Sequence, residues 1–328
     1  MAYSKEVVRR ARQRLETAKA ERESENLRRL QEAYRQVPRL KEIDILLRKS
    51  MALAAQAAFS RGGDAREAME QVRDANLALQ RERKMLADAH FEKGYLEDRP
   101  ICGNCGGSGY VGSTMCGCLA ELCRQEQKKE LSLLACGEGR FEDFRLDYYS
   151  DAVDAKLGHS PRTIMERCLR VSRNYAQQFG SGSGNLLFFG GTGLGKTMLS
   201  ACVATEVAER GYSVAYESAH NLFAKLEKDR FSPSEESRAA VERLHICDLL
   251  IIDDLGTELP GNFVTAALYN LVNERLLAGK PMMISTNLTA EEIGRRYSPQ
   301  IASRLQGSFQ WLIFVGEDIR IKKNRGTL

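Results

Sequence analysis

Residues 190–197 read GGTGLGKT and have the spacing G-x-x-x-x-G-K-[ST] of a phosphate-binding loop. An apolar run precedes the motif and a helix-forming segment follows it, which is the context that the motif requires. Glycines let backbone N–H groups wrap around phosphates, Lys196 can reach the β- and γ-phosphates, and the Thr197 hydroxyl can hold Mg²⁺. The alternative is a glycine turn with a chance lysine. We predict an ATP–Mg²⁺ site built from Gly190, Gly191, Thr192, Gly193, Leu194, Gly195, Lys196, Thr197 and Met198.

Two neighbouring carboxylates, Asp253 and Asp254, end the later apolar run LLIIDDL. An acidic residue at the carboxyl end of a strand beside a phosphate loop is where a Mg²⁺ ligand sits. We therefore assign Mg²⁺ binding to Asp253. Asp254 would act as the general base toward the attacking water. A pair of capping aspartates in a turn is the alternative.

Asn287 follows a third apolar run, MMIST. The carboxyl ends of parallel strands line the ligand crevice of such sheets. We expect its amide to hydrogen-bond the γ-phosphate or the attacking water. Without the other motifs, this residue would be read as part of a strand-end turn.

Four of the nine cysteines lie close together, at Cys102, Cys105, Cys116 and Cys118. Two residues between thiolates allow one tight turn to aim both sulfurs at one ion, and the second pair can complete a tetrahedron. The spacing predicts a closed structural zinc site. A four-thiolate iron–sulfur cluster and reduced bystander thiols are the alternatives.

Further residues near the cluster bear on its chemistry. Cys123 and Cys136 are close enough in sequence to replace a ligand. Four glycines would allow the backbone to adopt positive φ values in the turn that carries the sulfurs. They are Gly103, Gly106, Gly107 and Gly109.

The remaining pattern shows which elements must position these residues. Short apolar runs separated by helical segments predict a parallel sheet covered on both faces, with strands at 185–190, 213–218, 248–255, 281–287 and 311–316. We predict three parts: a helical region at 1–99, a zinc module and linker helix at 100–137, and an α/β domain at 138–328. Within the first part, Gly62-Gly63 separates two helices of a hairpin. Its second helix begins with a capping box from Asp64 to Glu67 and carries Val72, Leu79 and Leu86 on one face.

Composition places the chain among water-soluble globular proteins. It has 328 residues, 28% of them charged, and a net charge of +4. This mild charge permits contact with nucleic acid without indicating it. We find no apolar run of the roughly 20 residues that a membrane span needs, and the charged N-terminus lacks a signal-peptide core. These features predict a cytosolic protein without a membrane partner, in which clustered thiols bind metal rather than form disulfides.

The motifs together resemble an AAA+ ATPase of the DnaC/DnaI helicase-loader branch, which is related to IstB-type transposition helpers. The resemblance covers about residues 138–323 and is carried by FEDFRLDYYSD, IIDDLGTE, STNLTAEEI, IASRLQGSF and FVGEDIRIKK. It implies a P-loop fold without a C-terminal helical lid. It also makes Asn287 the sensor 1 residue and Arg320 the sensor 2 arginine that contacts the γ-phosphate.

The resemblance implies an arginine finger that acts on the ATP of a neighbouring subunit. Of the two positions that flank box VII, this chain has Arg304 at the second and Gln300 at the first. Glutamine cannot replace a permanently charged guanidinium. Arg304 is therefore the expected finger, and Arg295 and Arg296 are possible substitutes.

The resemblance also implies a function. A protein of this type binds the replicative hexameric DNA helicase and delivers it onto single-stranded DNA, with ATP binding, hydrolysis and homo-oligomerisation as the switch. The alternatives are an IstB-like transposition helper and an ATP-binding adaptor with little hydrolysis. An initiator that reads DNA sequence would need a helix-turn-helix after the ATPase domain. Residues 218–238, with Phe223 and Phe231, are either a DNA contact or a solvated helix with two core phenylalanines.

Overall fold

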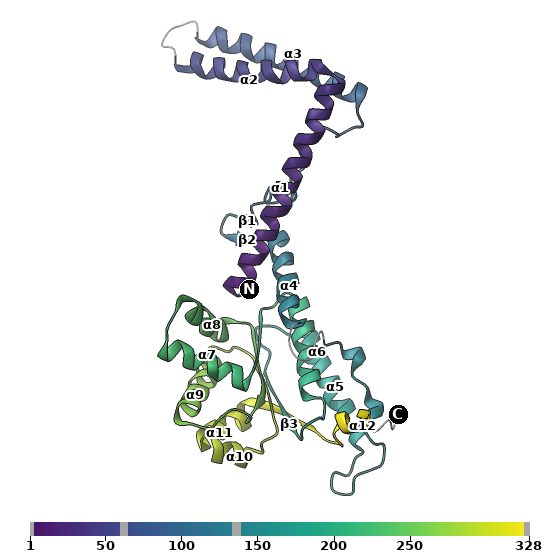
Figure 1. The fold of residues 1–328 in the computed structure, drawn as a ribbon, viewed down its shortest axis with the longest axis vertical. Coiled ribbons are helices and arrows are strands. Elements are labelled where there is room, and N and C mark those ends of the chain that lie inside the picture. Colours follow the sequence, from purple (N-terminus) through teal and green to yellow (C-terminus); the bar gives the residue numbers. More distant parts are fainter. Residues whose placement is uncertain (1–2, 60–64, 133–138, 325–328) are drawn as a thin grey trace. The chain divides into compact units, whose positions relative to one another are not determined.

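The computed structural model describes residues 3–59, 65–132 and 139–324 (Figure 1). They belong to two compact units, one formed by Met1–Arg12 with Gly117–Leu328 and the other by Gln13–Cys116. Among the described residues, no helix combines the length and the apolar character that a bilayer crossing requires.

The first unit contains a five-stranded sheet in the order β4-β5-β6-β3-β7, with every neighbouring pair parallel. This confirms the predicted fold class. The first strand matches its predicted range, and the last one begins and ends two residues earlier than predicted. The strands are β3 (Asn185–Gly190), β4 (Val214–Ser218), β5 (Leu249–Leu255), β6 (Met282–Thr286) and β7 (Phe309–Phe314).

Successive residues of a strand pack into two separate cores, because side chains alternate between the faces of a sheet. Leu186 and Phe188 of β3 pack into one core, and Leu187 packs into the other. The near-continuous apolar strands of the sequence are thus buried on both sides, as a parallel sheet requires. Figure 1 shows α5 and α6 on one face of the sheet and α7 to α11 on the other.

Several helices of this unit begin at strong capping signals. Ser160 and Ser298 accept hydrogen bonds from backbone N–H groups in the first turn, and a proline follows each of them. Thr289 forms a capping box with Glu292. The elements are α4 (Gly117–Ser132), α5 (Pro161–Gln177), α6 (Lys196–Glu209), α7 (Ala219–Phe231), α8 (Glu235–Ile246), α9 (Asn262–Leu277), α10 (Ala290–Arg296), α11 (Pro299–Ser308) and α12 (Ile319–Asn324), with 3₁₀ turns at Phe141–Asp143 and Leu146–Tyr148.

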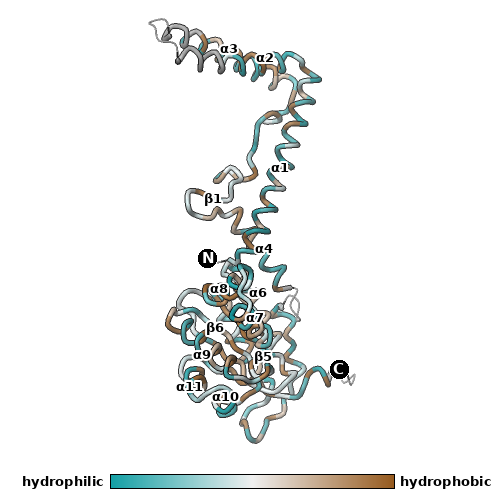
Figure 2. The backbone as a smooth tube through the Cα atoms, turned by 60° about the vertical axis from the view of Figure 1, so that its left-hand side comes forward, coloured by the Kyte–Doolittle hydropathy of each residue, from teal (hydrophilic) through white to brown (hydrophobic). Residues whose placement is uncertain are grey.

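The N-terminal region is helical, as predicted, with α1 (Lys5–Gln36), α2 (Pro38–Phe59) and α3 (Ala65–His90). Hydrophilic residues dominate α1 (Figure 2). The predicted helical stretch is too long, because α3 ends at His90 and not near Pro100. Phe91 and Tyr95 stack in the turns that follow, with ring centroids 5.1 Å apart.

Helices α2 and α3 pack side by side, as the predicted hairpin requires. Ion pairs join them, including Arg83 Nε to Asp44 Oδ1 at 2.7 Å and Arg39 Nε to Glu82 Oε1 at 2.8 Å. Leu86, from the predicted apolar stripe, packs against a small core of Ala33, Val37 and Leu40. The predicted Gly62-Gly63 break and the Asp64 cap lie outside the described residues.

A buried arginine holds several elements of the first unit together. Arg275 of α9 is 1% exposed, and its guanidinium donates to four carbonyl oxygens, those of Leu244, His245, Cys247 and Pro281. These carbonyls belong to the end of α8 and to the segments that lead into β5 and β6.

Replacing Arg275 with Leu should lower the free energy of unfolding by at least about 2 kcal/mol, because buried carbonyls then lose their donors. Chemical denaturation would measure the change. The exposed Arg170 of α5 supplies the control, since Arg170→Leu should change stability by less than about 0.5 kcal/mol. Equal effects from the two variants would contradict the proposed role of Arg275.

Candidate functional site: a phosphate loop with paired acids, and a four-cysteine cluster

The predicted phosphate loop connects the end of β3 to the start of α6. Its glycines are needed for shape: Gly190 has φ 154° and Gly195 has φ 89°. A Cβ on Gly190 would lie 2.3 Å from the carbonyl oxygen of Phe314, and one on Gly195 would lie 2.9 Å from the Tyr149 hydroxyl. The loop can therefore keep this path only with glycine at both positions.

Lys196 lies across the loop. Its ammonium donates to the carbonyl oxygens of Gly190 at 2.8 Å and Gly191 at 2.7 Å, and the residue is only 5% exposed. Burial lowers the pKa of Lys196, while the carboxylates of Asp254 and Asp253 act in the opposite direction. The lysine is thus desolvated, and its charge interacts with the carboxylates of Asp253 and Asp254.

Asp253 and Asp254 differ in environment although they are adjacent. Asp253 is buried, and its Oδ2 accepts a hydrogen bond of 2.9 Å from the Tyr216 hydroxyl. The same hydroxyl lies 3.5 Å from the carbonyl oxygen of Thr197, so Tyr216 joins the two predicted Mg²⁺ ligands. Asp254 is exposed at its edge of the sheet, and partial desolvation followed by repulsion from Asp253 raises its pKa.

Asp254 also has a backbone φ of 56°, the one positive value at a non-glycine residue in the described chain. This conformation costs about 1–3 kcal/mol and is found mainly at functional sites. Hydrogen bonds from the N–H and the hydroxyl of Thr257, at 3.2 and 2.8 Å, hold the Asp254 carbonyl.

Asn287 and Arg320 reach the same edge of the sheet. Phe189 pairs with Thr286, so Asn287 is level with Gly190 on the neighbouring strand. The backbone N–H of Ile319 donates to the carbonyl oxygen of Gly193 at 3.0 Å, which places the start of α12 on the phosphate loop. The positive charge of Arg320 adds to the lowering of the Lys196 pKa and opposes the net rise in the pKa of Asp254. Asn287 and Arg320 are both exposed.

The side chains at this edge fit ATP and Mg²⁺. Mg²⁺ prefers oxygen ligands and is bound through one or two protein groups plus substrate phosphates and water. The hydroxyl of Thr197 and the carboxylate of Asp253 supply such oxygens. The loop N–H groups and the start of α6 suit the phosphates.

Phe144 and Tyr149 also shape the loop, in a role that motif reasoning did not assign to them. Their rings stack with centroids 5.9 Å apart, and the buried Tyr149 hydroxyl donates to the carbonyl oxygen of Leu194 at 2.9 Å. The aromatic segment FEDFRLDYYSD was a signal for them, although its contact with the loop is visible only in three dimensions. These two rings pack against the phosphate loop at Gly195.

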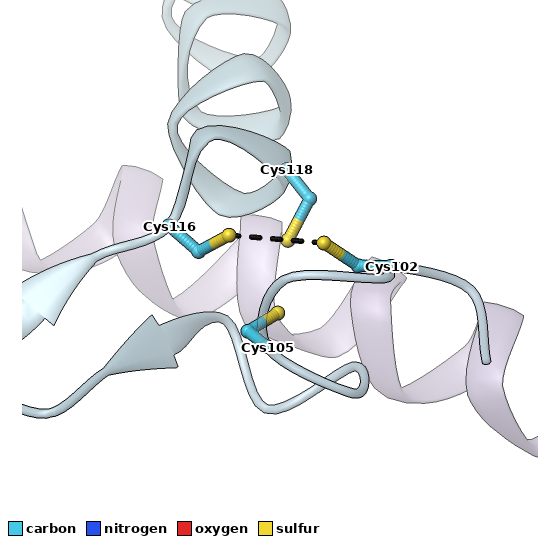
Figure 3. Close-up of side chains that lie close together, drawn as sticks. All are labelled: Cys102, Cys105, Cys116 and Cys118. Atoms are coloured by element: carbon cyan, nitrogen blue, oxygen red, sulfur yellow. Dashed lines mark hydrogen bonds between the residues drawn. The ribbon is translucent and has the colours of Figure 1, made fainter.

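The four predicted zinc ligands converge (Figure 3). The sulfurs of Cys102, Cys105, Cys116 and Cys118 all lie within 4.8 Å of one another, and those of Cys102 and Cys116 are 3.7 Å apart. A tetrahedral site with Zn–S bonds of about 2.3 Å has sulfur–sulfur edges of about 3.8 Å. The backbone N–H of Gly109 donates to the Cys105 sulfur at 3.3 Å. The cluster therefore fits a tetrahedral thiolate-bound ion.

The glycines around the cluster behave largely as predicted. Gly106, Gly107 and Gly109 have positive φ values, at 60°, 91° and 79°, whereas Gly103 is not among the residues with positive φ. Two short strands, β1 (Tyr110–Val111) and β2 (Thr114–Met115), then return the chain to Cys116. Hydrogen bonds at the first turn lower the pKa of Cys102, chiefly those from the backbone of Cys105 and Asn104.

Cys123 is not part of the cluster. It is 0% exposed within α4, and burial raises its pKa to about 11, so it stays a neutral thiol. Cys136, the other predicted substitute ligand, lies outside the described residues.

Sequence comparison identifies the nucleotide-binding part. Residues 169–304 match the family model described as IstB-like ATP binding protein. This segment is an IstB-like ATP-binding domain. It is of the AAA+ type and distantly related to the DnaC helicase loaders.

Relatives of the IstB-like domain include two kinds of protein. "Replicative helicase loader DnaC" of Escherichia coli K12 is 27% identical over 154 residues, which are 46% of this chain and 62% of the loader. The match therefore spans less than two thirds of that relative. A "putative insertion sequence ATP-binding protein" of Sinorhizobium fredii is 33% identical over 103 residues, 31% of this chain and 34% of that protein. A crystal structure of the DnaC helicase loader has a TM-score of 0.44 and 18% identity, over 53% of this chain and 98% of that one.

The arginine candidates of the IstB-like domain have different surroundings. Arg304 stacks on the Tyr269 ring, with 4.8 Å from its guanidinium carbon to the ring centroid, and donates to Asn273 Oδ1 at 2.7 Å. Its guanidinium is therefore held against α9 of its own chain. Arg295 is 71% exposed and pairs with Glu291, and Gln300 is exposed.

Arg296 is tied to a buried acid that motif reasoning missed. Glu258 is 3% exposed, and it accepts hydrogen bonds from the Tyr297 hydroxyl, the guanidinium of Arg296 and the Gly256 N–H at 3.0 Å. The final residue of the IIDDLGTE motif was its sequence signal. Glu258 thereby connects the loop after Asp254 to α10.

Lys196→Ala should abolish ATP binding, because it removes the cation that balances the phosphates. Titration with a fluorescent ATP analogue would measure the affinity. Lys280→Ala is the control and should bind ATP normally, because this half-buried lysine lies outside the loop and its ammonium donates to the Ile246 carbonyl. Retained affinity in Lys196→Ala would contradict the assignment of the loop.

Purified protein should contain about one zinc per chain by elemental analysis, since four thiolates complete one coordination sphere. Cys102→Ser and Cys118→Ser should each lose the metal and lower the melting temperature. Cys168→Ser, which changes a buried thiol outside the cluster, should keep the zinc. Iron with visible absorbance would favour an iron–sulfur cluster, and protein free of metal would contradict a metal site.

Proposed function

We propose that this protein is an ATP-hydrolysing loader that binds a replicative DNA helicase and delivers it onto single-stranded DNA in the cytoplasm. The observation that carries the proposal is the convergence of a loop lysine, two acids and an exposed arginine at one sheet edge in a domain related to DnaC. The helical region at 1–99 lies outside the family match and would hold the partner.

The site residues divide the work of hydrolysis. Lys196 and the loop N–H groups bind and neutralise the phosphates, and Arg320 contacts the γ-phosphate. Asn287 orients the attacking water, and Asp254 accepts its proton. The raised pKa of Asp254 suits a general base. Thr197 and Asp253 would hold Mg²⁺, which would supply charge stabilisation for the phosphates.

A homo-oligomer formed with ATP would bring an arginine of one subunit to the ATP of the next. Arg304 remains the finger candidate from the family pattern, and it would have to leave Tyr269 and Asn273 to act. Arg295 is engaged only by an ion pair with Glu291 whose two side chains are exposed, and such a pair is weak. We therefore propose Arg295 as the alternative finger.

Exposed apolar side chains on the hairpin support a protein partner there. Leu77 is 44% exposed and Met85 is 73% exposed on α3, and Ile45 and Leu46 of α2 are each 42% exposed. We infer that these residues of α2 and α3 belong to the partner-binding surface, because an apolar patch left in solvent marks such a site.

The segment proposed to meet DNA has one core and one exposed phenylalanine. Phe223 is 4% exposed and belongs to the core, whereas Phe231 is 66% exposed. Arg230 lies over the rings of both Phe231 and Phe263, at 5.6 and 5.4 Å from their centroids. An exposed aromatic next to a guanidinium can stack on a base and contact its phosphate.

One observation favours a second candidate, a transposition helper ATPase. The matching family model is that of IstB-like proteins, and one relative is an insertion-sequence ATP-binding protein. In that case the helical region would bind a transposase. A third candidate is an ATP-binding adaptor with little hydrolysis. It is supported by Arg304, whose guanidinium is held by Tyr269 and Asn273 of its own chain.

Size-exclusion chromatography of the full chain with a purified replicative hexameric helicase and ATP tests the proposal. We expect a complex, and we expect Leu77→Asp with Met85→Asp to weaken it at least tenfold, by about 1.4 kcal/mol or more. The matched double variant Val153→Asp with Leu157→Asp changes exposed apolar residues outside the hairpin and should bind normally. A chain that binds a transposase and not the helicase would favour the second candidate.

A further inference from the structure

The two acids of the phosphate site lie on a β-bulge. Three residue steps on β5, from 252 to 255, are matched by only two steps on β6, from 284 to 286. Asp253 and Asp254 therefore lie opposite the single residue Ser285. A bulge bends its strand and re-aims the side chains, and here one acid is buried while the next is exposed.

The Ser285 side chain contacts both acids at this bulge. Its hydroxyl donates to Asp253 Oδ1 at 2.5 Å and accepts the backbone N–H of Asp254 at 2.8 Å. Ser285 is 0% exposed, so water does not compete for either bond. A hydroxyl has one donor hydrogen and two acceptor lone pairs, so a serine can make both contacts at once.

We propose that Ser285 is a positioning residue for ATP hydrolysis, whose hydroxyl holds the Mg²⁺ ligand Asp253 and the general base Asp254 in register. This inference rests on the proposed hydrolytic function. Its physical basis is the positive φ of Asp254, which persists only if surrounding contacts maintain it. Thr257 holds the carbonyl side of Asp254, and Ser285 holds the N–H side.

Tyr216 provides a natural comparison, because its hydroxyl bonds the second carboxylate oxygen of Asp253. Its hydroxyl donates to Asp253 Oδ2 at 2.9 Å. Loss of that hydroxyl should affect the Mg²⁺ ligand alone, whereas loss of the Ser285 hydroxyl should affect the ligand and the base together.

The test is steady-state ATP hydrolysis by the full chain over a range of Mg²⁺ concentrations, for Ser285→Ala and Tyr216→Phe. For Ser285→Ala we expect kcat at saturating Mg²⁺ to fall about tenfold to a hundredfold, as for a misplaced catalytic group. For Tyr216→Phe we expect a higher Mg²⁺ requirement and a kcat near that of the wild type once Mg²⁺ saturates.

Thr286→Val is the matched control for the loss of a buried hydroxyl. Thr286 donates to the Leu255 carbonyl and accepts from the Leu288 N–H, and it touches neither acid. Thermal unfolding followed by Trp311 fluorescence should place Ser285→Ala and Thr286→Val at similar melting temperatures. Only Ser285→Ala should lose turnover selectively.

Two results would overturn the inference. One is a wild-type kcat and Mg²⁺ dependence in Ser285→Ala, which would leave Ser285 with a packing role only. The other is an equal loss of kcat in Thr286→Val, which would indicate a general disturbance of the strand.

Failure of the proposed hydrolysis itself would be seen separately, as wild-type turnover no faster than that of Lys196→Ala. Binding of a fluorescent ATP analogue with Mg²⁺ and with EDTA would then decide the role of Ser285. A smaller Mg²⁺-dependent gain in affinity in Ser285→Ala supports the inference, and an unchanged gain overturns it.

Discussion

The phosphate site depends on one constraint, which is that all five strands run parallel and are covered by helices on both faces. Parallel strands end at a common edge, so the polar residues at the carboxyl ends of β3, β5 and β6 meet there although they are far apart in sequence. The same constraint excludes water from most of each strand. Lys196 and Asp253 consequently sit in a desolvated environment, where charge interactions with a nucleotide are stronger than in water.

Neighbouring elements hold the phosphate loop and the backbone of Asp254 in their conformations. The loop passes so close to Phe314 and Tyr149 that only glycine fits at the contact points. The strained backbone at Asp254 is held from β6 on one side and by its own turn on the other. Because each support comes from a different element, the site would be sensitive to changes well away from the nucleotide.

The four-cysteine cluster has a different source of stability from the parallel sheet. The helical unit has a small apolar core centred on Ala33, Val37 and Leu40, and its exposed ion pairs add little stability because water screens them. A metal held by four thiolates supplies folding free energy that does not depend on the size of a core. Turn geometry and sulfur spacing, rather than hydrophobic burial, therefore order residues 102–118.

The sequence by itself determined the parallel sheet, the phosphate loop and the cysteine cluster, because each depends on local spacing and apolar periodicity. It also placed Asp253, Asp254 and Asn287 at strand ends, since each of them comes directly at the end of an apolar run. Tertiary structure decided which acid is buried, because a one-residue bulge against β6 sets it. It likewise placed Tyr149 beneath the loop, Glu258 against Arg296, and Arg304 against Tyr269. These contacts join residues 31 to 45 positions apart, and no local pattern encodes which side chains meet at such a distance.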